Sequence, residues 1–319
     1  ICSMSNPYIG INNSARLVKQ ISIGQSGVAR KVLNGYVGVN GVARLFYQVR
    51  IPLEYSYTGR SSVQDITVDG VEYTVLTLTS SGTLTFNRSI DTDIWMCGGG
   101  GNGGEGTRFD NSGTGVSNSA GGGGGGYIAT APMQLTGNIT CVIGAARGTS
   151  EFGEATAAGG TTPSNQNGGA GASGGGGGIH YRSNNSVYTA GIGGQGSGGS
   201  TIPAMFGLTD RHCAGGAGGV FIYSGFRWSG TGGSNGGNGA PGDLTERNGR
   251  PREILGGERG GGMGRGSTNA NWSNINGTFY GSGGGGGSCS YYSSEASQRS
   301  GGTGYQGVVY IRWKKEDAE

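Results

Sequence analysis

The 319-residue chain is poor in charge and in lysine, and each scarcity excludes a class of protein. Only 13% of the residues are charged, and the net charge is +3. So small a charge does not predict a nucleic acid or an anionic membrane as partner. The few lysines lie near the two ends of the sequence, and none follows a phosphate-binding glycine loop. We therefore expect no nucleotide cofactor and no nucleic-acid partner.

Histidine, cysteine and long apolar runs are scarce too. His180 and His212 have no evident nucleophile and acid partners, so we expect no enzyme. The five cysteines are scattered without a CxxC spacing, and the pair His212–Cys213 lacks the further ligands of a tetrahedral metal site. The apolar runs are only a handful of residues long, far shorter than a membrane-spanning helix. We expect no metal, no cofactor of any kind and no membrane insertion.

Glycine is the residue in excess. The chain has 76 glycines, and most of them lie between Gly98 and Gly307. Runs such as Gly121–Gly126 break any Gly-X-Y period, which excludes collagen. A flexible linker and a bundle of polyproline-II helices remain, and in the bundle neighbouring helices would satisfy one another's backbone groups. Apolar segments such as Tyr127–Met133 and Val220–Tyr223 interrupt the glycine, and they favour the bundle.

A 14-residue repeat occupies residues 8–49, with copies beginning at Tyr8, Ser22 and Tyr36. Each copy predicts strand, two-residue turn, strand, because its centre holds residues that tolerate positive φ. The turns are Asn12-Asn13, Ser26-Gly27 and Asn40-Gly41. One hairpin is marginal alone, so we expect the three to stack or pair within a module spanning residues 1–50. Their Ala-Arg pairs are interpreted as a solvated face.

Residues 51–319 predict an all-β fold, an antiparallel β-sandwich whose strands lie in 51–97, 127–156 and 305–313. Glycine-rich insertions at 98–126 and 157–304 would separate these strands. In detail, we expect a bulge after Val75, where the alternation changes phase, and two strands at Tyr127–Met133 and Asn138–Gly144. Asp91 and Asp93 are interpreted as turn residues, not as a catalytic carboxylate pair.

Several segments together resemble glycine-rich phage tail proteins. They are DIWMCGGGGNGGEG, AGGGGGGYIATAPMQLTGNITCVIGAA, EFGEATAAGG, YGSGGGGGS and GYQGVVYIRW, in that order over roughly residues 63–313. The hairpin repeats also look like modules found near tail-protein domains of phages that infect Gram-positive bacteria.

The resemblance implies a tumour-necrosis-factor-like sandwich with inserted glycine helices, similar to the glycine-rich domain of anaplastic-lymphoma-type receptor kinases. The adhesins at the fibre tips of T-even-like phages are a second relative, and they touch the host receptor with apical loops. The resemblance to phage tail proteins implies a virion location in the tail, with assembly in the bacterial cytoplasm. It also implies a homotrimer, contacts with other tail or baseplate proteins, and a glycan or protein receptor on the host. It assigns no receptor-contact residue.

Aromatic residues in the stretches between glycine runs are the candidates for receptor contact, because such side chains cover much area at little entropic cost. Capping of the bundle ends is the alternative role for each of them. The candidates are Tyr181, Tyr188, Phe206, Tyr223, Phe226, Trp228, Trp272, Tyr291 and Tyr292.

Three other functions stay open. A purely structural tail or cell-surface component would have the same sequence features without receptor contact. Arg259-Gly-Gly and Arg265-Gly resemble RNA-binding RGG segments, but arginines are sparse here and are offset by Glu253 and Glu258. An ice-binding bundle would need flat arrays of small residues, whereas bulky aromatic stretches interrupt this chain.

Overall fold

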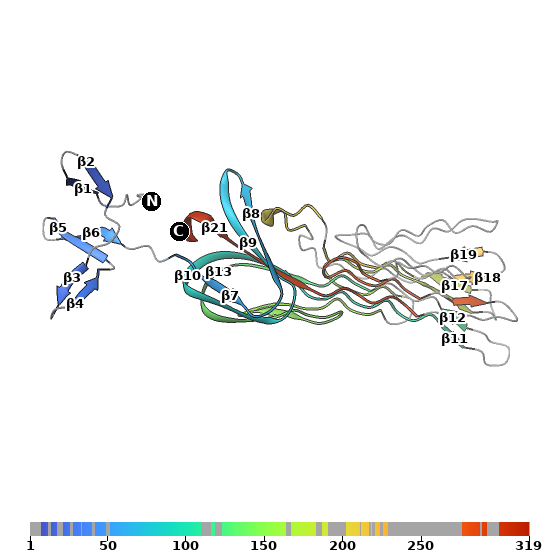
Figure 1. The fold of residues 1–319 in the computed structure, drawn as a ribbon. Coiled ribbons are helices and arrows are strands. Elements are labelled where there is room, and N and C mark those ends of the chain that lie inside the picture. Colours follow the sequence, from blue (N-terminus) through green and yellow to red (C-terminus); the bar gives the residue numbers. More distant parts are fainter. Residues whose placement is uncertain are drawn as a thin grey trace. The chain divides into compact units, whose positions relative to one another are not determined.

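The computed structural model describes residues 8–11, 14–17, 22–25, 28–32, 34–39, 42–48, 52–109, 116–118, 123–163, 167–182, 187–190, 202–210, 212–216, 218, 221–223, 226–228, 276–287, 289–291 and 300–318. Contacts divide the chain into two compact units, Ile1–Leu53 with Glu319, and Glu54–Ala318. The fold is all-β apart from a 3-10 turn, η2 (Ala204–Phe206), and a terminal turn of helix, α1 (Lys315–Ala318) (Figure 1).

The first unit contains three β-hairpins with the same internal register. Gly10 pairs with Ala15, Gly24 with Ala29 and Gly38 with Ala43, which confirms the hairpin predicted for each copy of the repeat. Among the described residues, each hairpin is a separate two-stranded sheet, and no ladder joins one to the next. The strands are β1 (Tyr8–Ile11), β2 (Ser14–Leu17), β3 (Ser22–Gln25), β4 (Val28–Lys31), β5 (Asn34–Val39) and β6 (Val42–Gln48).

The second unit is built on an eight-stranded antiparallel sheet. Its order is β15-β14-β13-β10-β21-β9-β8, and β7 pairs with β10 beside this path. The strands are β7 (Tyr55–Tyr57), β8 (Ser61–Val68), β9 (Val71–Leu78), β10 (Gly82–Cys97), β13 (Ile128–Val142), β14 (Ser150–Phe152), β15 (Ala155–Ala157) and β21 (Val308–Lys314). A two-residue turn joins β8 to β9, with Asp69 and Gly70 at φ 51° and 77°.

The long strand β10 changes direction partway along its length. Its register with β13 shifts between Phe86 and Ile90, a β-bulge that bends the strand. The first half of β10 pairs with β7 and the second half with β21. Trp313 of β21 packs edge-on against Phe86 and Tyr55. The bend therefore brings side chains from both halves of the sheet into contact. The tumour-necrosis-factor-like form of this sheet stays a prediction.

Three local expectations are wrong. Val75 shows no bulge, because β9 keeps its register with both neighbours and buries Val75 and Leu76 on opposite faces. The two strands expected within residues 127–144 form the single strand β13, which passes through Gly137 at φ 63°. Asp91 and Asp93 are not turn residues: both lie in β10, where Asp91 accepts a hydrogen bond from Gln134 and Asp93 pairs with Arg312.

The glycine-rich chain leaves this sheet and re-enters it twice. One excursion runs from the end of β10 to the start of β13, and the other from β15 to β21. The excursions carry short strands that form two small sheets. The sheet β11-β12-β16-β17 takes two strands from each excursion, and the sheet β19-β18-β20 comes from the second alone. Their bounds are β11 (Thr107–Phe109), β12 (Val116–Asn118), β16 (Ile179–Arg182), β17 (Val187–Ala190), β18 (Phe221–Tyr223), β19 (Phe226–Trp228) and β20 (Cys289–Tyr291). Within this unit the short strands lie where the glycine runs end, away from the eight-stranded sheet (Figure 1).

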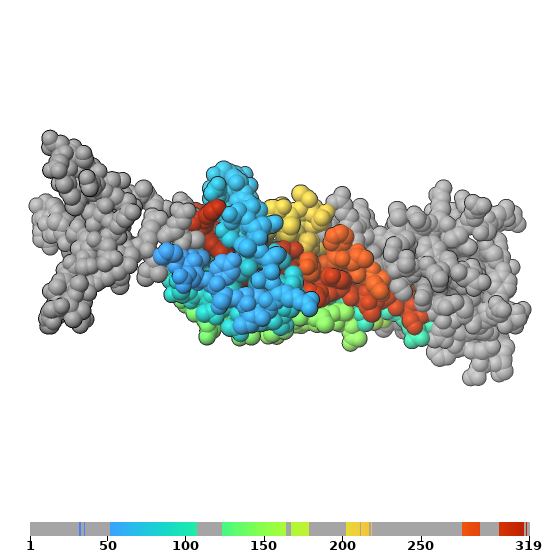
Figure 2. Space-filling model, viewed as in Figure 1, coloured from blue at the N-terminus to red at the C-terminus, as the bar shows by residue number. Residues whose placement is uncertain are grey.

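On the face shown in Figure 2, segment 202–210 lies at the surface beside β8 and β9. Ile66 of β8 contacts this segment, since a Cβ on Gly207 would lie 3.1 Å from it. Arg312 holds the same segment by donating a hydrogen bond to the Met205 carbonyl while its guanidinium lies over the Tyr73 ring. The segment is therefore anchored to the sheet.

Candidate functional site

The glycine segments of the second unit hold one another through backbone hydrogen bonds. All four amides of Gly123–Gly126 donate to other segments, at distances of 2.7 to 3.1 Å. Their acceptors are the carbonyls of Gly284, Thr161, Ser173 and Gly281. In the chain this short run lies just before β13. It is bonded to several segments of the glycine-rich excursion at once, so it is an interior member of the assembly and not a linker.

Between any one pair of the segments below, the hydrogen bonds recur at every third residue. Gly98 donates to Tyr127 and Gly101 to Gly124, while Gly284 donates to Gly101 and Gly287 to Gly104. The same step joins two other segments, where Gly302 donates to Gly285 and Tyr305 to Ser282. A three-residue step differs from the two-residue alternation of a β-ladder.

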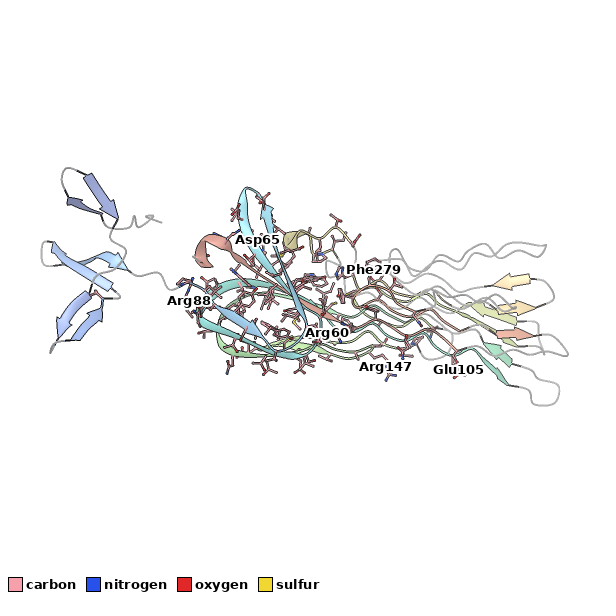
Figure 3. All side chains as sticks on the ribbon, viewed as in Figure 1. Arg60, Asp65, Arg88, Glu105, Arg147 and Phe279 are labelled. Atoms are coloured by element: carbon pink, nitrogen blue, oxygen red, sulfur yellow. The ribbon has the colours of Figure 1, made fainter. Side chains whose placement is uncertain are left out.

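The segments approach so closely that side chains have no room. A Cβ added to Gly125 would overlap the carbonyl oxygen of Cys213, and one added to Gly103 would overlap that of Gly285. Among the side chains drawn in Figure 3, most accordingly lie over the sheet, and few lie along the glycine runs. Glu105 and Arg147 are two labelled side chains beside these runs. Glycine composition is thus a packing requirement of this assembly.

The small sheet β19-β18-β20 places four of the nine candidates, together with Phe221, on one face. Tyr223 pairs with Phe226 on one side and with Tyr291 on the other. Two residues along, Phe221 pairs with Trp228. Residues that are directly paired, or two apart along a strand, share a face of a sheet. The register therefore places these five aromatic residues on the same face, while Ile222, Arg227 and Ser290 occupy the other.

The remaining five candidates fall in three different situations. Tyr181 and Tyr188 are paired directly across β16 and β17. Phe206 is fully buried against Tyr310, so its side chain cannot contact a receptor in this conformation. Trp272 and Tyr292 lie outside the described residues, as do Arg259 and Arg265.

Two exposed aromatic residues lie on the glycine assembly itself. Phe279 and Tyr305 are 38% and 40% exposed, and Tyr305 packs edge-on against Tyr280. Figure 3 labels Phe279. Tyr305 was not among the sequence candidates, because it stands beside the final strand and not in a long stretch between glycine runs. The hydrogen bond from its amide to Ser282 brings it next to Tyr280.

His212 belongs to a buried aromatic cluster and not to a metal site. Its Nδ1 lies 3.1 Å from the Asp210 carbonyl, and its Nε2 lies 2.8 Å from the Tyr310 hydroxyl. The carbonyl can only accept, so Nδ1–H donates to it, and in the neutral ring Nε2 accepts from the hydroxyl. Trp95 packs edge-on against the ring. Burial lowers the pKa of His212, and the Asp210 carbonyl only partly opposes this.

The thiols of Cys97 and Cys213 lie next to this cluster and face each other. Both residues are fully buried. Burial, and then the hydrogen bond with Cys97, raise the pKa of Cys213 well above its ordinary range. Sequence spacing could not predict this contact, because the two cysteines are far apart in the chain. Among the described residues, no group of three or more His, Cys, Asp or Glu side chains is placed to hold a metal ion.

The family can now be assigned. A family model described as a glycine-rich domain matches residues 77–314. The chain belongs to this glycine-rich domain family. The match begins in β9 and ends at the last residue of β21, and these two strands are neighbours in the sheet. The glycine-rich domain therefore includes the central strands, both glycine excursions and both small sheets, whereas β7, β8 and the hairpins precede it.

Comparison with curated proteins finds no matching relative of this glycine-rich domain protein. Within the described residues, no helix has the length and hydropathy that a membrane crossing requires.

Proposed function

We propose that this protein is a non-enzymatic component of a phage tail that displays receptor-contact residues on a rigid glycine platform. The observation that carries the proposal is the register of β18 with β19 and β20, which collects five aromatic residues on one sheet face. Aromatic residues dominate the energetics of many recognition surfaces. The phage location rests on the resemblance of the ordered sequence segments.

The platform is proposed to be a bundle of polyproline-II helices. A polyproline-II helix has three residues per turn, and the hydrogen bonds between glycine segments recur at every third residue. The absence of room for a Cβ at Gly103 and Gly125 supports the same packing. Such a bundle would keep the short strands in place without a conventional apolar core.

In the proposed particle, the hairpins of the first unit attach the chain to other tail or baseplate proteins or to sister subunits. The eight-stranded sheet is proposed to trimerise as a tumour-necrosis-factor-like sandwich. The receptor is proposed to be a glycan or a protein on the bacterial surface. The protein would be assembled in the host cytoplasm and would function in the virion.

The test compares the two faces of the sheet β19-β18-β20. We expect Tyr223→Ala and Phe226→Ala to weaken adsorption of the particle to host cells by about tenfold or more, as loss of a central aromatic contact does. Ile222→Ala, on the opposite face, is the matched control and should leave adsorption unchanged.

Thermal unfolding and incorporation into particles must be the same for all three variants. Unchanged adsorption with both aromatic variants would favour the alternative function, a purely structural tail component. Equal loss with Ile222→Ala would show that the small sheet, and not its aromatic face, had been damaged.

A further inference from the structure

The buried cysteine pair is the most informative feature that the proposed function leaves unused. A Cβ placed on Gly281 would lie 2.7 Å from the Cys213 sulfur and 3.0 Å from the Cys97 sulfur. Both sulfurs thus reach the same point, and the two thiols are within hydrogen-bonding reach of each other. The carbonyl oxygen of Gly98 lies 3.0 Å from the same point.

The third described cysteine is in a different environment. Cys141 lies in β13 and interacts with the Tyr57 hydroxyl, with no thiol among the contacts that shift its pKa. A buried cysteine usually packs as a small apolar residue. Cys97 and Cys213 go beyond that role because each presents its sulfur to the other.

We propose that Cys97 and Cys213 are a site of covalent modification, where an oxidant of the small-molecule disulfide class joins them into an intrachain disulfide. One thiolate attacks the reagent RSSR, which gives a mixed disulfide and releases one RSH after protonation. The second thiolate attacks the protein sulfur of that mixed disulfide and releases the second RSH. Two protein thiols are oxidised, one RSSR is reduced to two RSH, and no other reactant is needed.

The position of the link gives it a structural effect. Cys97 is the last residue of β10, where the first glycine excursion begins, and Cys213 opens the segment that leads through Gly216 to β18. The Cys213 amide already donates to the Tyr280 carbonyl, and Gly216 to Gly123. A disulfide would fasten the second glycine excursion directly to the central strand and would close a loop of more than one hundred residues, which restricts the unfolded chain.

The burial of both thiols predicts how the reaction proceeds. A buried thiol with a raised pKa is a poor nucleophile at neutral pH. In the folded protein the link should therefore form slowly at pH 7 and faster as the pH rises. During folding in an oxidising solution, before the site closes, it should form readily. A reducing cytosol would keep the thiols free, and release into an oxidising medium would allow the link.

The experiment refolds the full chain in a mixture of reduced and oxidised glutathione, blocks the remaining thiols with an alkylating reagent and maps tryptic peptides. Cleavage isolates Cys97 in residues 89–108 and Cys213 in residues 212–227. We expect these two peptides joined, with a mass two hydrogens below their sum. The oxidised chain should melt at a higher temperature than the chain treated with reductant.

Two variants make the outcome unambiguous. Cys141→Ala should keep the link and the gain in Tm, whereas Cys213→Ala should lose both. The proposal is overturned if both peptides are recovered alkylated and unlinked from the refolded wild-type chain, or if Cys97 is found joined to another cysteine. The wild-type peptide map decides the matter even if a variant fails to fold. Neither result depends on adsorption to cells.

Discussion

At the scale of single residues, the second unit is sensitive to the smallest side-chain changes in its glycine runs. Gly125 donates to Ser173 at 2.8 Å, and a Cβ on it would overlap the Cys213 carbonyl. We expect Gly125→Ala to destabilise the protein by about 3 kcal/mol or more, the upper part of the range for overpacking, because backbone and not a flexible side chain must move.

Chemical denaturation monitored by tyrosine and tryptophan fluorescence measures this change. Gly137→Asn is the control, since Gly137 has open space around it and Asn tolerates its φ of 63°. If Gly125→Ala unfolds at the same denaturant concentration as the wild type, Gly125 is not an interior position.

His212 predicts a dependence of stability on pH. Its folded-state pKa is lowered below the ordinary 6.5, first of all by burial. The unfolded chain therefore binds this proton at a higher pH than the folded chain does. The neutral His212 side chain contributes its full stabilisation of the folded state above about pH 6.5. This contribution is lost as the pH falls from there through the lowered folded-state pKa.

We expect the Tm to fall between pH 7 and pH 5 by more in the wild type than in His212→Gln, which can keep hydrogen bonds without titrating in this range. The difference between the two proteins at each pH isolates His212 from the carboxylates. Parallel curves for the two proteins would contradict this assignment.

At the scale of elements, order in the glycine runs is the property to measure. The amides of Gly123–Gly126 and of Gly283 and Gly284 all donate to other segments. We expect these amides to exchange with solvent at least about a hundredfold more slowly than in an unstructured peptide, because each must break its bond to exchange. Hydrogen exchange read by NMR or by mass spectrometry of short peptides gives the rates. Exchange at unstructured rates in both runs would restore the linker interpretation.

Elements specified by local chemistry could be predicted from the sequence. The hairpin turns at Asn40-Gly41 and Asp69-Gly70 follow from residues that tolerate positive φ, and GVVYIRW alone indicates the last strand. The bend of β10 could not be placed, because the shift between Phe86 and Ile90 depends on the partner strand β13. The change of phase after Val75 was misleading for a related reason. Strand β9 buries side chains on both faces, so its apolar residues do not follow a two-residue alternation.

The type of residue at the candidate site could be predicted from the sequence, but the positions of these residues relative to one another could not. Aromatic residues between glycine runs stood out, but only the register shows that Tyr223, Phe226 and Tyr291 occupy paired positions in one small sheet. Phe206 looked equivalent in sequence and is buried. The contact of His212 with Tyr310 joins residues 98 positions apart, a separation across which sequence spacing carries no information.

At the scale of the whole molecule, the division at Leu53 predicts that the second unit folds by itself. We expect a chain lacking residues 1–53 to keep its Tm within about 2 °C, because a shift of that size corresponds to less than about 1 kcal/mol in a domain of this length. In the proposed particle the same deletion should prevent incorporation into tails. Differential scanning calorimetry and purification of assembled particles measure the two effects. A large fall in Tm would show that the hairpins support the sheet.

The attachment of each glycine excursion to two strands of the eight-stranded sheet has a mechanical consequence. A pull applied at β18 or β16 would pass along the second excursion into β15 and β21, in the direction of the strands. Through the hydrogen bonds between glycine segments it would also reach the first excursion and its strands β10 and β13. Bonds between antiparallel strands lie perpendicular to the strand axis, so such a load shears many of them at once and cannot open them one by one from an end. An appendage that must stay attached while its far end is held by a moving cell would benefit from being loaded in this direction.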